Sequence, residues 1–420
     1  MKIGIFTYGT RGDLQPYITI ALGLMKRGNE VMIAAAADFR QLVEGYGISF
    51  HPLYGEAEQM MNTDQAKAIL QSGNQLQLMK YYFRFLHNIR QPLRKSYEEA
   101  FSKVDGIVAN SMTIPITSVL AEKYNKKLVL TYFMPPVVET AAYPISDFDF
   151  LNFGWYNRLT YRLAQSMFWK YIKDDVNEYR VEQGMEPLHT NLIKELDRKC
   201  TPDLYCISKH LIPQPADWQS HHKITGFVSV EQAQRSGHMQ EQLPENLKAW
   251  LDEGDAPVYI GFGSNAVGDA AKVIAIIERI LQETNYRVLF CTGWAVYDNI
   301  PQHERLYVAK YVNHEQIFSR CRVGVFHGGA GTFAAMLRHG LPVAIVSFYT
   351  DQPTWGKIAV KKRLGAHVPY KQLSFERLKM AIAIADNETI RTNTKRMGEA
   401  IIAENGLENV LHEIEAALYI

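Results

Sequence analysis

The sequence lacks any apolar run of about 18–20 residues, the length that a helix needs to span a bilayer. The first strand-like stretch, residues 2–8, meets Gly9, Arg11 and Asp13 too soon to form the core of a signal peptide. We therefore expect a cytoplasmic protein, and we leave peripheral contact with a membrane surface open.

An excess of charge of one sign is also absent. The 45 lysines and arginines nearly balance the 44 aspartates and glutamates, for a formal net charge of +1. A general nucleic-acid-binding protein needs a basic excess to neutralise phosphates, so this class is excluded. The cysteines form no Cys-x-x-Cys pair, which predicts buried, reduced thiols at Cys200, Cys206, Cys291 and Cys321.

The 420 residues exceed what one compact core usually holds, which indicates two domains. In both halves short apolar runs alternate with segments of helical periodicity, the pattern of a parallel sheet with crossover helices. Strands are expected at residues 2–8, 31–36, 106–109, 128–133 and 204–207, and again at 257–264, 287–291, 306–309, 322–326 and 342–347. The predicted fold class is α/β, with two Rossmann-like doubly wound domains facing each other across a cleft at the carboxyl ends of their strands.

The predicted boundaries are an N-terminal domain at residues 1–225, a polar interdomain linker at 226–254 and a C-terminal domain at 255–400. The last stretch, 401–420, is predicted to be a helix that can pack back on the N-terminal domain. Aromatic residues gather at 80–86 and 132–169, where the α/β pattern is weak. They are interpreted either as core packing or as the wall of a ligand site.

The strongest local motif is His327-Gly-Gly-Ala-Gly-Thr332, between a predicted strand and a predicted helix. Its glycines allow a ligand to approach the backbone, and the helix start directs free amides and about half a positive charge at the same point. His327 and Thr332 add side-chain donors. A turn that merely lets helix and sheet pack is the alternative, but the flanking His and Thr favour phosphate binding.

Two further turns follow predicted strands in the same half. Gly261-Phe-Gly-Ser264 repeats the glycine-rich pattern and would supply a second donor for a diphosphate. Asp351 and Gln352 could together bind neighbouring sugar hydroxyls, although an Asp before Pro353 is, judged alone, more typical of a helix N-cap. No Asp-x-Asp motif accompanies these turns, so no metal ligand is predicted.

A fourth motif, Gly9-Thr-Arg-Gly-Asp13, connects the first predicted strand to the first predicted helix. Asp13 could accept a proton from a substrate hydroxyl, or it could be the N-cap of the helix. A carboxylate with an ordinary pKa of about 3.9 is a weak base toward an alcohol, so the site would have to raise this pKa. Arg11 would lower the pKa, and we therefore expect its side chain to face away.

Together the motifs at 9–16, 261–264, 326–332 and 348–356 resemble those of the UDP-sugar-dependent glycosyltransferases of GT-B fold. The most similar groups are the sterol 3-β-glucosyltransferases and the bacterial transferases that decorate macrolide and glycopeptide antibiotics. The motifs occur in the family's order from the first strand to about Gly365, whereas residues 55–200 show little likeness.

By this resemblance the N-terminal domain binds an acceptor and the C-terminal domain binds a UDP-sugar, with glucose as the default sugar and no separate cofactor. Asp13 matches the catalytic base. The implied donor-binding positions are Gly12, Ser264, Trp294, Val312, His327, Gly329, Ala330, Gly331, Thr332, Asp351 and Gln352. Phe326 departs from a common second histidine, and Thr350 departs from a usual glycine, which leaves the sugar more open.

The implied reaction is a metal-independent, inverting transfer of a hexose to a hydroxyl of a small hydrophobic acceptor such as a sterol, terpenoid, polyketide or phenol. The helix start and His327 would stabilise the departing UDP while Asp13 deprotonates the acceptor. Two alternatives stay open: an isomerase like the UDP-N-acetylglucosamine 2-epimerases, and a binding protein that senses a UDP-sugar without chemistry. The oligomeric state is not indicated.

Overall fold

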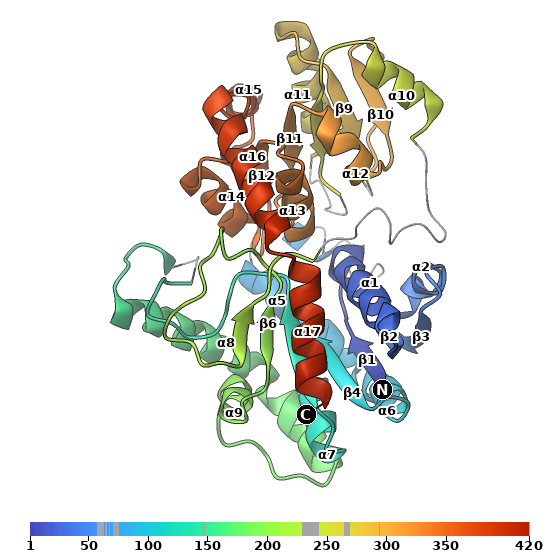
Figure 1. Ribbon diagram of the computed structural model, residues 1–420, viewed down its shortest axis with the longest axis vertical. Coiled ribbons are helices and arrows are strands. Elements are labelled where there is room, and N and C mark those ends of the chain that lie inside the picture. The colour runs from blue at the N-terminus through green and yellow to red at the C-terminus, as the bar shows by residue number, and fades with distance from the viewer. Residues whose placement is uncertain are drawn as a thin grey trace. The chain divides into compact units, whose positions relative to one another are not determined.

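The structure is a computed structural model that describes residues 1–56, 63, 65–66, 68–69, 75–145, 148–228, 243–263, 269–293 and 295–419. The chain divides into two compact units (Figure 1). The first unit comprises Met1–Asn62, Leu76–Val230 and Asn405–Ile420, and the second comprises Thr63–Gln75 and Glu231–Glu404.

The first unit is built on a seven-stranded sheet in which every neighbouring pair is parallel. The strands are β1 (Lys2–Phe6), β2 (Glu30–Ala36), β3 (Ser49–Leu53), β4 (Gly106–Asn110), β5 (Leu128–Tyr132), β6 (Asp203–Tyr205) and β7 (His222–Ile224). Their order is β3-β2-β1-β4-β5-β6-β7, so the chain reverses its direction of travel between β1 and β4. The five predicted strands are confirmed. The two edge strands were not predicted: β3 contains His51 and Pro52, and β7 has only three residues.

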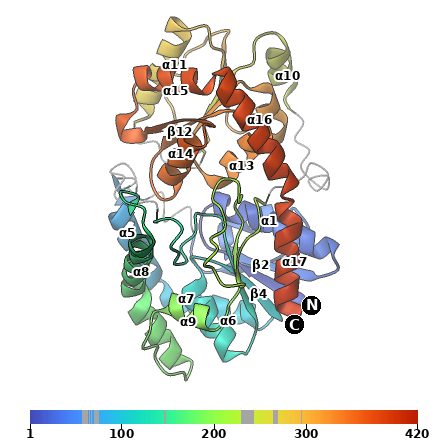
Figure 2. The same cartoon turned by 60° about the vertical axis from the view of Figure 1, so that its left-hand side comes forward.

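Helices connect these strands. They are α1 (Arg11–Lys26), α2 (Arg40–Glu44), α5 (Gln75–Asn88), α6 (Arg90–Phe101), α7 (Ile114–Lys123), α8 (Gly154–Glu182), α9 (Leu192–Arg198) and α17 (Gly406–Tyr419). Part of the predicted aromatic cluster holds α5 against α8 (Figure 2). The Phe83 ring stacks on Tyr171 at 6.0 Å and meets Phe168 edge-on at 5.9 Å. This part of the cluster is packing, whereas Phe150 and Trp155 are 79% and 68% exposed.

Helix α17 packs against α1 and β4 of the first unit (Figure 1). Two glycines permit this contact: a Cβ at Gly23 would lie 2.5 Å from Leu411 Cδ1, and a Cβ at Gly106 would lie 3.0 Å from Leu418 Cδ1. At the rim, the guanidinium of Arg27 forms ion pairs with two glutamates of α17. The end of the chain is therefore an integral part of the first unit.

The second unit has a six-stranded sheet, again parallel throughout. Its strands are β8 (Val258–Gly261), β9 (Val288–Cys291), β10 (Leu306–Ala309), β11 (Val323–Phe326), β12 (Val343–Ser347) and β13 (Gly365–Pro369). The order is β10-β9-β8-β11-β12-β13. The last strand was not predicted; it begins at a glycine because a Cβ at Gly365 would lie 1.7 Å from the carbonyl oxygen of Val343.

The helices of the second unit are α10 (Glu245–Asp252), α11 (Ala270–Glu283), α12 (His314–Ile317), α13 (Ala330–Arg338), α14 (Gln352–Lys361), α15 (Phe375–Ala385) and α16 (Glu388–Ala403). A buried apolar core joins the sheet to α11 and α15, with Ile277 and Ile382 fully buried in it. The predicted linker at 226–254 includes α10, and its residues 229–242 lie outside the described part of the chain.

The cysteines are all free, but only Cys206 and Cys291 are buried, so the expectation of four buried thiols is wrong for exposed Cys200 and half-buried Cys321. Cys200 follows the end of α9 in a turn with a φ of 52°, which brings its side chain to the surface. Among the described helices, none has both the length and the apolar character that crossing a bilayer requires.

We expect Gly23→Ala to lower the free energy of unfolding by about 1–3 kcal/mol, because the new methyl group overpacks the contact with Leu411. Combining it with Leu411→Ala should recover part of this loss. A double-mutant cycle from denaturant unfolding measures the coupling. Strict additivity of the two substitutions would contradict the docking of α17 on α1.

Candidate functional site

The residues predicted to bind a donor follow successive strands of the second unit. His327, Gly331 and Thr332 follow β11, Asp351 and Gln352 follow β12, and Val312 follows β10. Strands β8 and β11 are neighbours at the point where the strand order reverses. In a parallel α/β sheet, ligands bind at the carboxyl ends of the strands at this switch point. The topology therefore gathers the predicted donor residues at the edge where a ligand is expected.

The N-terminus of α13 lies directly at this switch point. Gly329 is its N-cap, and as a glycine it provides no capping side chain. The first intrahelical bond runs from Phe333 N–H to the Gly329 carbonyl, so the amides of Ala330, Gly331 and Thr332 have no partner within the helix. Three amides and the positive end of a nine-residue helix thus converge in one place, which favours an anion.

The three glycines of this turn have different roles. A Cβ at Gly328, where φ is 94°, would lie 2.8 Å from Ile345 Cγ2, and a Cβ at Gly329 would lie 2.4 Å from His327 Nε2. At these two positions the absence of a Cβ permits the close packing of the turn. A Cβ at Gly331, in contrast, would meet no atom within 4 Å. The space beside Gly331 is therefore open.

His327 lies over Gly329, with Gly263 on its other side. A Cβ at Gly263 would lie 3.3 Å from His327 Cε1. The Nδ1 atom is buried and has no hydrogen-bond partner among the described residues. Burial, with a smaller contribution from His314, lowers the pKa of His327 to about 4. The ring is neutral at pH 7, so it offers one N–H donor to a ligand rather than a positive charge.

Asp351 occupies the N-cap position of α14 but does not cap it with its side chain. The predicted capping role is therefore wrong. Its carboxylate instead accepts hydrogen bonds from the indole N–H of the fully buried Trp355 at 2.7 Å and from the Thr350 hydroxyl at 3.0 Å. These bonds fix the orientation of the carboxylate.

The neighbouring Gln352 is buried, and its side-chain oxygen accepts hydrogen bonds from the backbone N–H groups of Phe348 and Tyr349 at 2.9 and 3.3 Å. This amide therefore shapes the loop after β12 and would contact a sugar through its NH₂ group. Thr350 in the same loop has a φ of 55°, in the left-handed region that favours glycine. That conformation explains why a glycine is usual at this position.

The loops after β8, β9 and β10 meet near His327. A Cβ at Gly293 would lie 2.1 Å from the carbonyl oxygen of Gly263, and the Gly293 N–H donates to the carbonyl of Lys310 at 3.1 Å. Val312 lies half-buried in the last of these loops. The predicted contacts of Ser264 and Trp294 lie outside the described residues, although the glycines that precede both converge here.

In the first unit, Asp13 is the third residue of α1, directly after the carboxyl end of β1. It is not the N-cap, which is Thr10; the predicted N-cap assignment is corrected accordingly. The Asp13 carboxylate completes a capping box by accepting from the Thr10 N–H at 2.7 Å and the Thr10 hydroxyl at 3.0 Å. A Cβ at Gly9 would lie 2.5 Å from the same oxygen, so the glycine makes room for the carboxylate. Gly12 is exposed beside it.

Asp13 is exposed to solvent. Burial of its carboxyl group by surrounding protein nevertheless raises the pKa of Asp13, and this effect outweighs the hydrogen bonds from Thr10, which lower the pKa. This is the shift that a general base requires. The side chain of Arg11 lies outside the described part of the structure, so its predicted orientation stays a prediction.

The charge of this carboxylate also acts on a polar group that the sequence did not indicate. The hydroxyl of Tyr82 on α5 is buried and has no hydrogen-bond partner among the described residues. Burial raises its pKa, and the charge of Asp13 contributes to the rise. The sequence placed Tyr82 only in an aromatic cluster, because nothing in the helical pattern relates α5 to the turn after β1.

Two family models match the chain. The glycosyltransferase family 28 N-terminal domain matches residues 3–143, and the erythromycin biosynthesis protein CIII-like C-terminal domain matches residues 295–417. Curated relatives include a sterol 3-beta-glucosyltransferase of Arabidopsis thaliana, 30% identical over 97% of this chain and 64% of its own length. Another, from Candida albicans, is 28% identical over 99% of this chain and 28% of its own length. The chain thus spans less than two thirds of these relatives.

Solved structures show the same fold. The glycosyltransferase of kitacinnamycin has a TM-score of 0.70 at 16% identity, over 99% of both chains. The calicheamicin glycosyltransferase CalG4 has a TM-score of 0.69 at 15% identity, over 100% of this chain and 98% of the other. A Streptomyces glycosyltransferase complexed with thymidine diphosphate has a TM-score of 0.65 at 15% identity, over 99% of both. From its two family domains and its fold, the chain belongs to the GT-B glycosyltransferases.

Proposed function

We propose that the protein transfers a hexose, with glucose as the expected sugar, from a UDP-sugar to a hydroxyl group of a small hydrophobic acceptor. The observation that carries the proposal is the start of α13. Its uncapped amides, the unpartnered Nδ1 of His327 and the open space over Gly331 lie together at the switch point of a parallel sheet. A diphosphate matches all three features.

On the donor side, the helix start and His327 stabilise the negative charge that develops on UDP as it leaves. Because His327 is neutral, it contributes a directed hydrogen bond while the amides of α13 contribute the electrostatic field. Asp351, oriented by Trp355, and the amide of Gln352 bind the sugar hydroxyls. These groups are preorganised by contacts within the second unit.

On the acceptor side, the oxygen of the acceptor hydroxyl group attacks the anomeric carbon, and Asp13 accepts the proton of that hydroxyl group. The bond between that carbon and the diphosphate oxygen breaks in the same displacement, which inverts the configuration. The raised pKa of Asp13 makes it a stronger base than an ordinary carboxylate. No step of this mechanism uses a metal ion.

A sterol-like acceptor is supported by the sterol 3-beta-glucosyltransferases among the relatives. The first unit also exposes large apolar side chains around the start of α8. Phe153 and Trp155 stack on each other at 6.3 Å while remaining 50% and 68% exposed. Exposed, mutually stacked rings provide an apolar surface for a ring-containing molecule.

We expect Asp13→Asn to keep the fold and UDP affinity but to lower turnover by 10²-fold or more, of the order of a lost general base. The asparagine oxygen can still accept from Thr10, so the capping box persists. Turnover by UDP release, with UDP affinity from calorimetry, checks this. Turnover near that of the unchanged protein would refute the base assignment.

Thr10→Ala is the matched control because it removes a cap hydroxyl and keeps the carboxylate. It should lower the free energy of unfolding by about 1 kcal/mol. Turnover should stay within a few-fold, with its acidic limb shifted to higher pH because one hydrogen bond that lowers the pKa of Asp13 is lost. A loss of turnover as large as that of Asp13→Asn would mean that the capping box, not the base, limits activity.

We expect Gly331→Ala to weaken UDP binding at least tenfold without loss of stability. The new methyl group meets no protein atom within 4 Å, and alanine favours a helix over glycine by about 1 kcal/mol. Calorimetric titration with UDP and the melting temperature of the free protein separate the two effects. Unchanged UDP affinity would show that the diphosphate does not lie over the start of α13.

The overall activity is tested by measuring nucleoside diphosphate release from several UDP-sugars and from a dTDP-sugar, crossed with a panel of sterols, terpenoids and phenols in the presence of a chelator. Release that requires both a UDP-sugar and an alcohol supports the proposal. Sugar interconversion without an alcohol would identify an epimerase instead, and binding without turnover for every acceptor would identify a sensor.

A further inference from the structure

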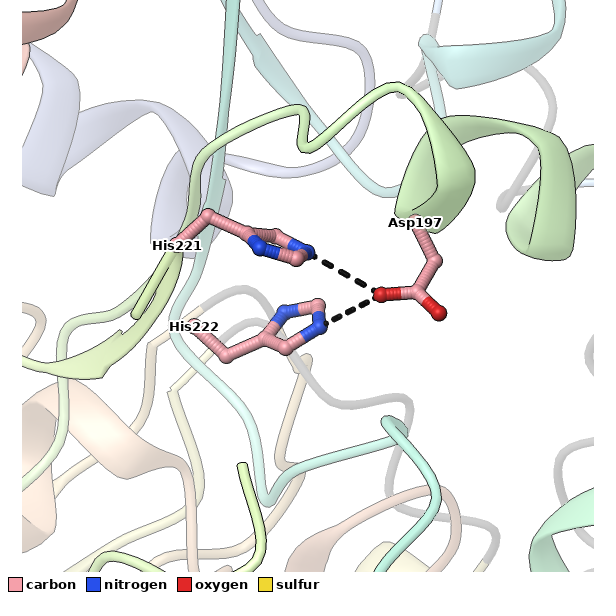
Figure 3. A group of neighbouring side chains, drawn as sticks. All are labelled: Asp197, His221 and His222. Atoms are coloured by element: carbon pink, nitrogen blue, oxygen red, sulfur yellow. Dashed lines mark hydrogen bonds and ion pairs between the residues drawn. The ribbon is translucent and has the colours of Figure 1, made fainter. Parts of the chain in front are cut away.

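A group of two histidines and an aspartate lies in the first unit, away from the turn that carries Asp13. His221 and His222 precede and open β7, and Asp197 lies in the last turn of α9. The Nε2 atoms of both rings point at the same carboxylate oxygen of Asp197, at 3.0 and 2.9 Å (Figure 3). Both imidazoles are buried, whereas the Asp197 side chain is 46% exposed, so the group opens to solvent on one side.

A second carboxylate lies at the other ring nitrogen of His222. Its Nδ1 lies 3.1 Å from Oδ2 of Asp203, which is buried at the start of β6 and pairs in register with His222. Outer carboxylates of this kind orient the histidines of metal sites and raise their basicity.

The three residues bring their ligand atoms close together. One ligand atom from each of Asp197, His221 and His222 lies within 4.8 Å of the other two, and the two imidazole centroids are 3.9 Å apart. Both Nε2 atoms are directed at one carboxylate oxygen. A divalent ion beside that oxygen would take one ligand atom from each residue.

We infer that Asp197, His221 and His222 form a transition-metal site of two imidazole nitrogens and one carboxylate oxygen, suited to Zn²⁺. Imidazole and carboxylate ligands favour this class of ion, and water would complete the coordination. Tetrahedral bonds of about 2.0–2.1 Å place ligand atoms about 3.3 Å apart. The separations of 3.0 and 2.9 Å between each Nε2 and the carboxylate oxygen are close to this value, and one ligand atom from each residue lies within 4.8 Å of the other two.

The location assigns this site a structural role. Asp203 and His222 are the first residues of β6 and β7, whereas Asp13 follows the carboxyl end of β1. Because the sheet is parallel throughout, these are opposite edges. A bound ion would tie α9 to the amino ends of two strands. The site is therefore independent of the proposed transfer reaction.

The test uses the full chain without an affinity tag, stripped with a chelator and then titrated with Co²⁺ and Zn²⁺. One equivalent of Co²⁺ should produce a visible d–d absorption band that Zn²⁺ abolishes, and Zn²⁺ should raise the melting temperature. Asp197→Asn and His221→Gln should each remove the band and the thermal shift. Asp203→Asn should weaken binding by about 10–100-fold without changing the stoichiometry.

Two controls exclude other ligands. His87→Gln removes an exposed histidine that contacts a single carboxylate, Asp175, and Cys200→Ser removes the exposed thiol closest in sequence to Asp197. Both should bind the metal as the unchanged protein does. The inference would be overturned if the Co²⁺ band is absent, or if metal binding survives in both Asp197→Asn and His221→Gln. It would also be overturned if the melting temperature responds to pH but not to Zn²⁺. Asp197→Asn changes a half-exposed side chain, so the test holds even if the variant of buried Asp203 fails to fold.

Discussion

The central constraint in the second unit is the position of the N-terminus of α13 at the switch point of the sheet. Strand β11 ends at the switch point of the sheet, and the chain turns immediately into α13. Gly328 and Gly329 make this turn possible by clearing Ile345 and the His327 ring. As a result three backbone amides without helical partners lie where neighbouring loops also converge. An anion is the ligand that such an arrangement stabilises.

Asp13 and Asp351 have similar positions in the two units. Each carboxylate lies at the start of a helix, where negative charge stabilises the helix dipole. Each is also fixed by short hydrogen bonds, from Thr10 in one case and from Trp355 in the other. Asp13 completes a capping box, whereas Asp351 occupies the N-cap position without capping its helix through the side chain.

The two edges of the first sheet have different characters. The carboxyl edge carries Asp13, and the amino edge carries the group of Asp197, His221 and His222. A parallel sheet separates these edges by the full length of its strands. The polar clusters can therefore serve chemistry on one side and stability on the other without competing for the same groups.

The sequence by itself determined the parallel α/β class, ten of the thirteen described strands and the four motifs, because apolar periodicity and glycine spacing are local properties of the chain. It also identified His327, Asp13 and Asp351 as functional candidates. Only the tertiary structure decided that a side chain at Gly328 or Gly329 would clash while the space beside Gly331 is open. It alone brought Asp197 to the two histidines, since these contacts join residues on different elements of the chain. Strand β13 depends on the close approach of the Val343 backbone to Gly365, and the packing of α17 depends on the close approach of Leu411 to Gly23. No local sequence pattern encodes these contacts.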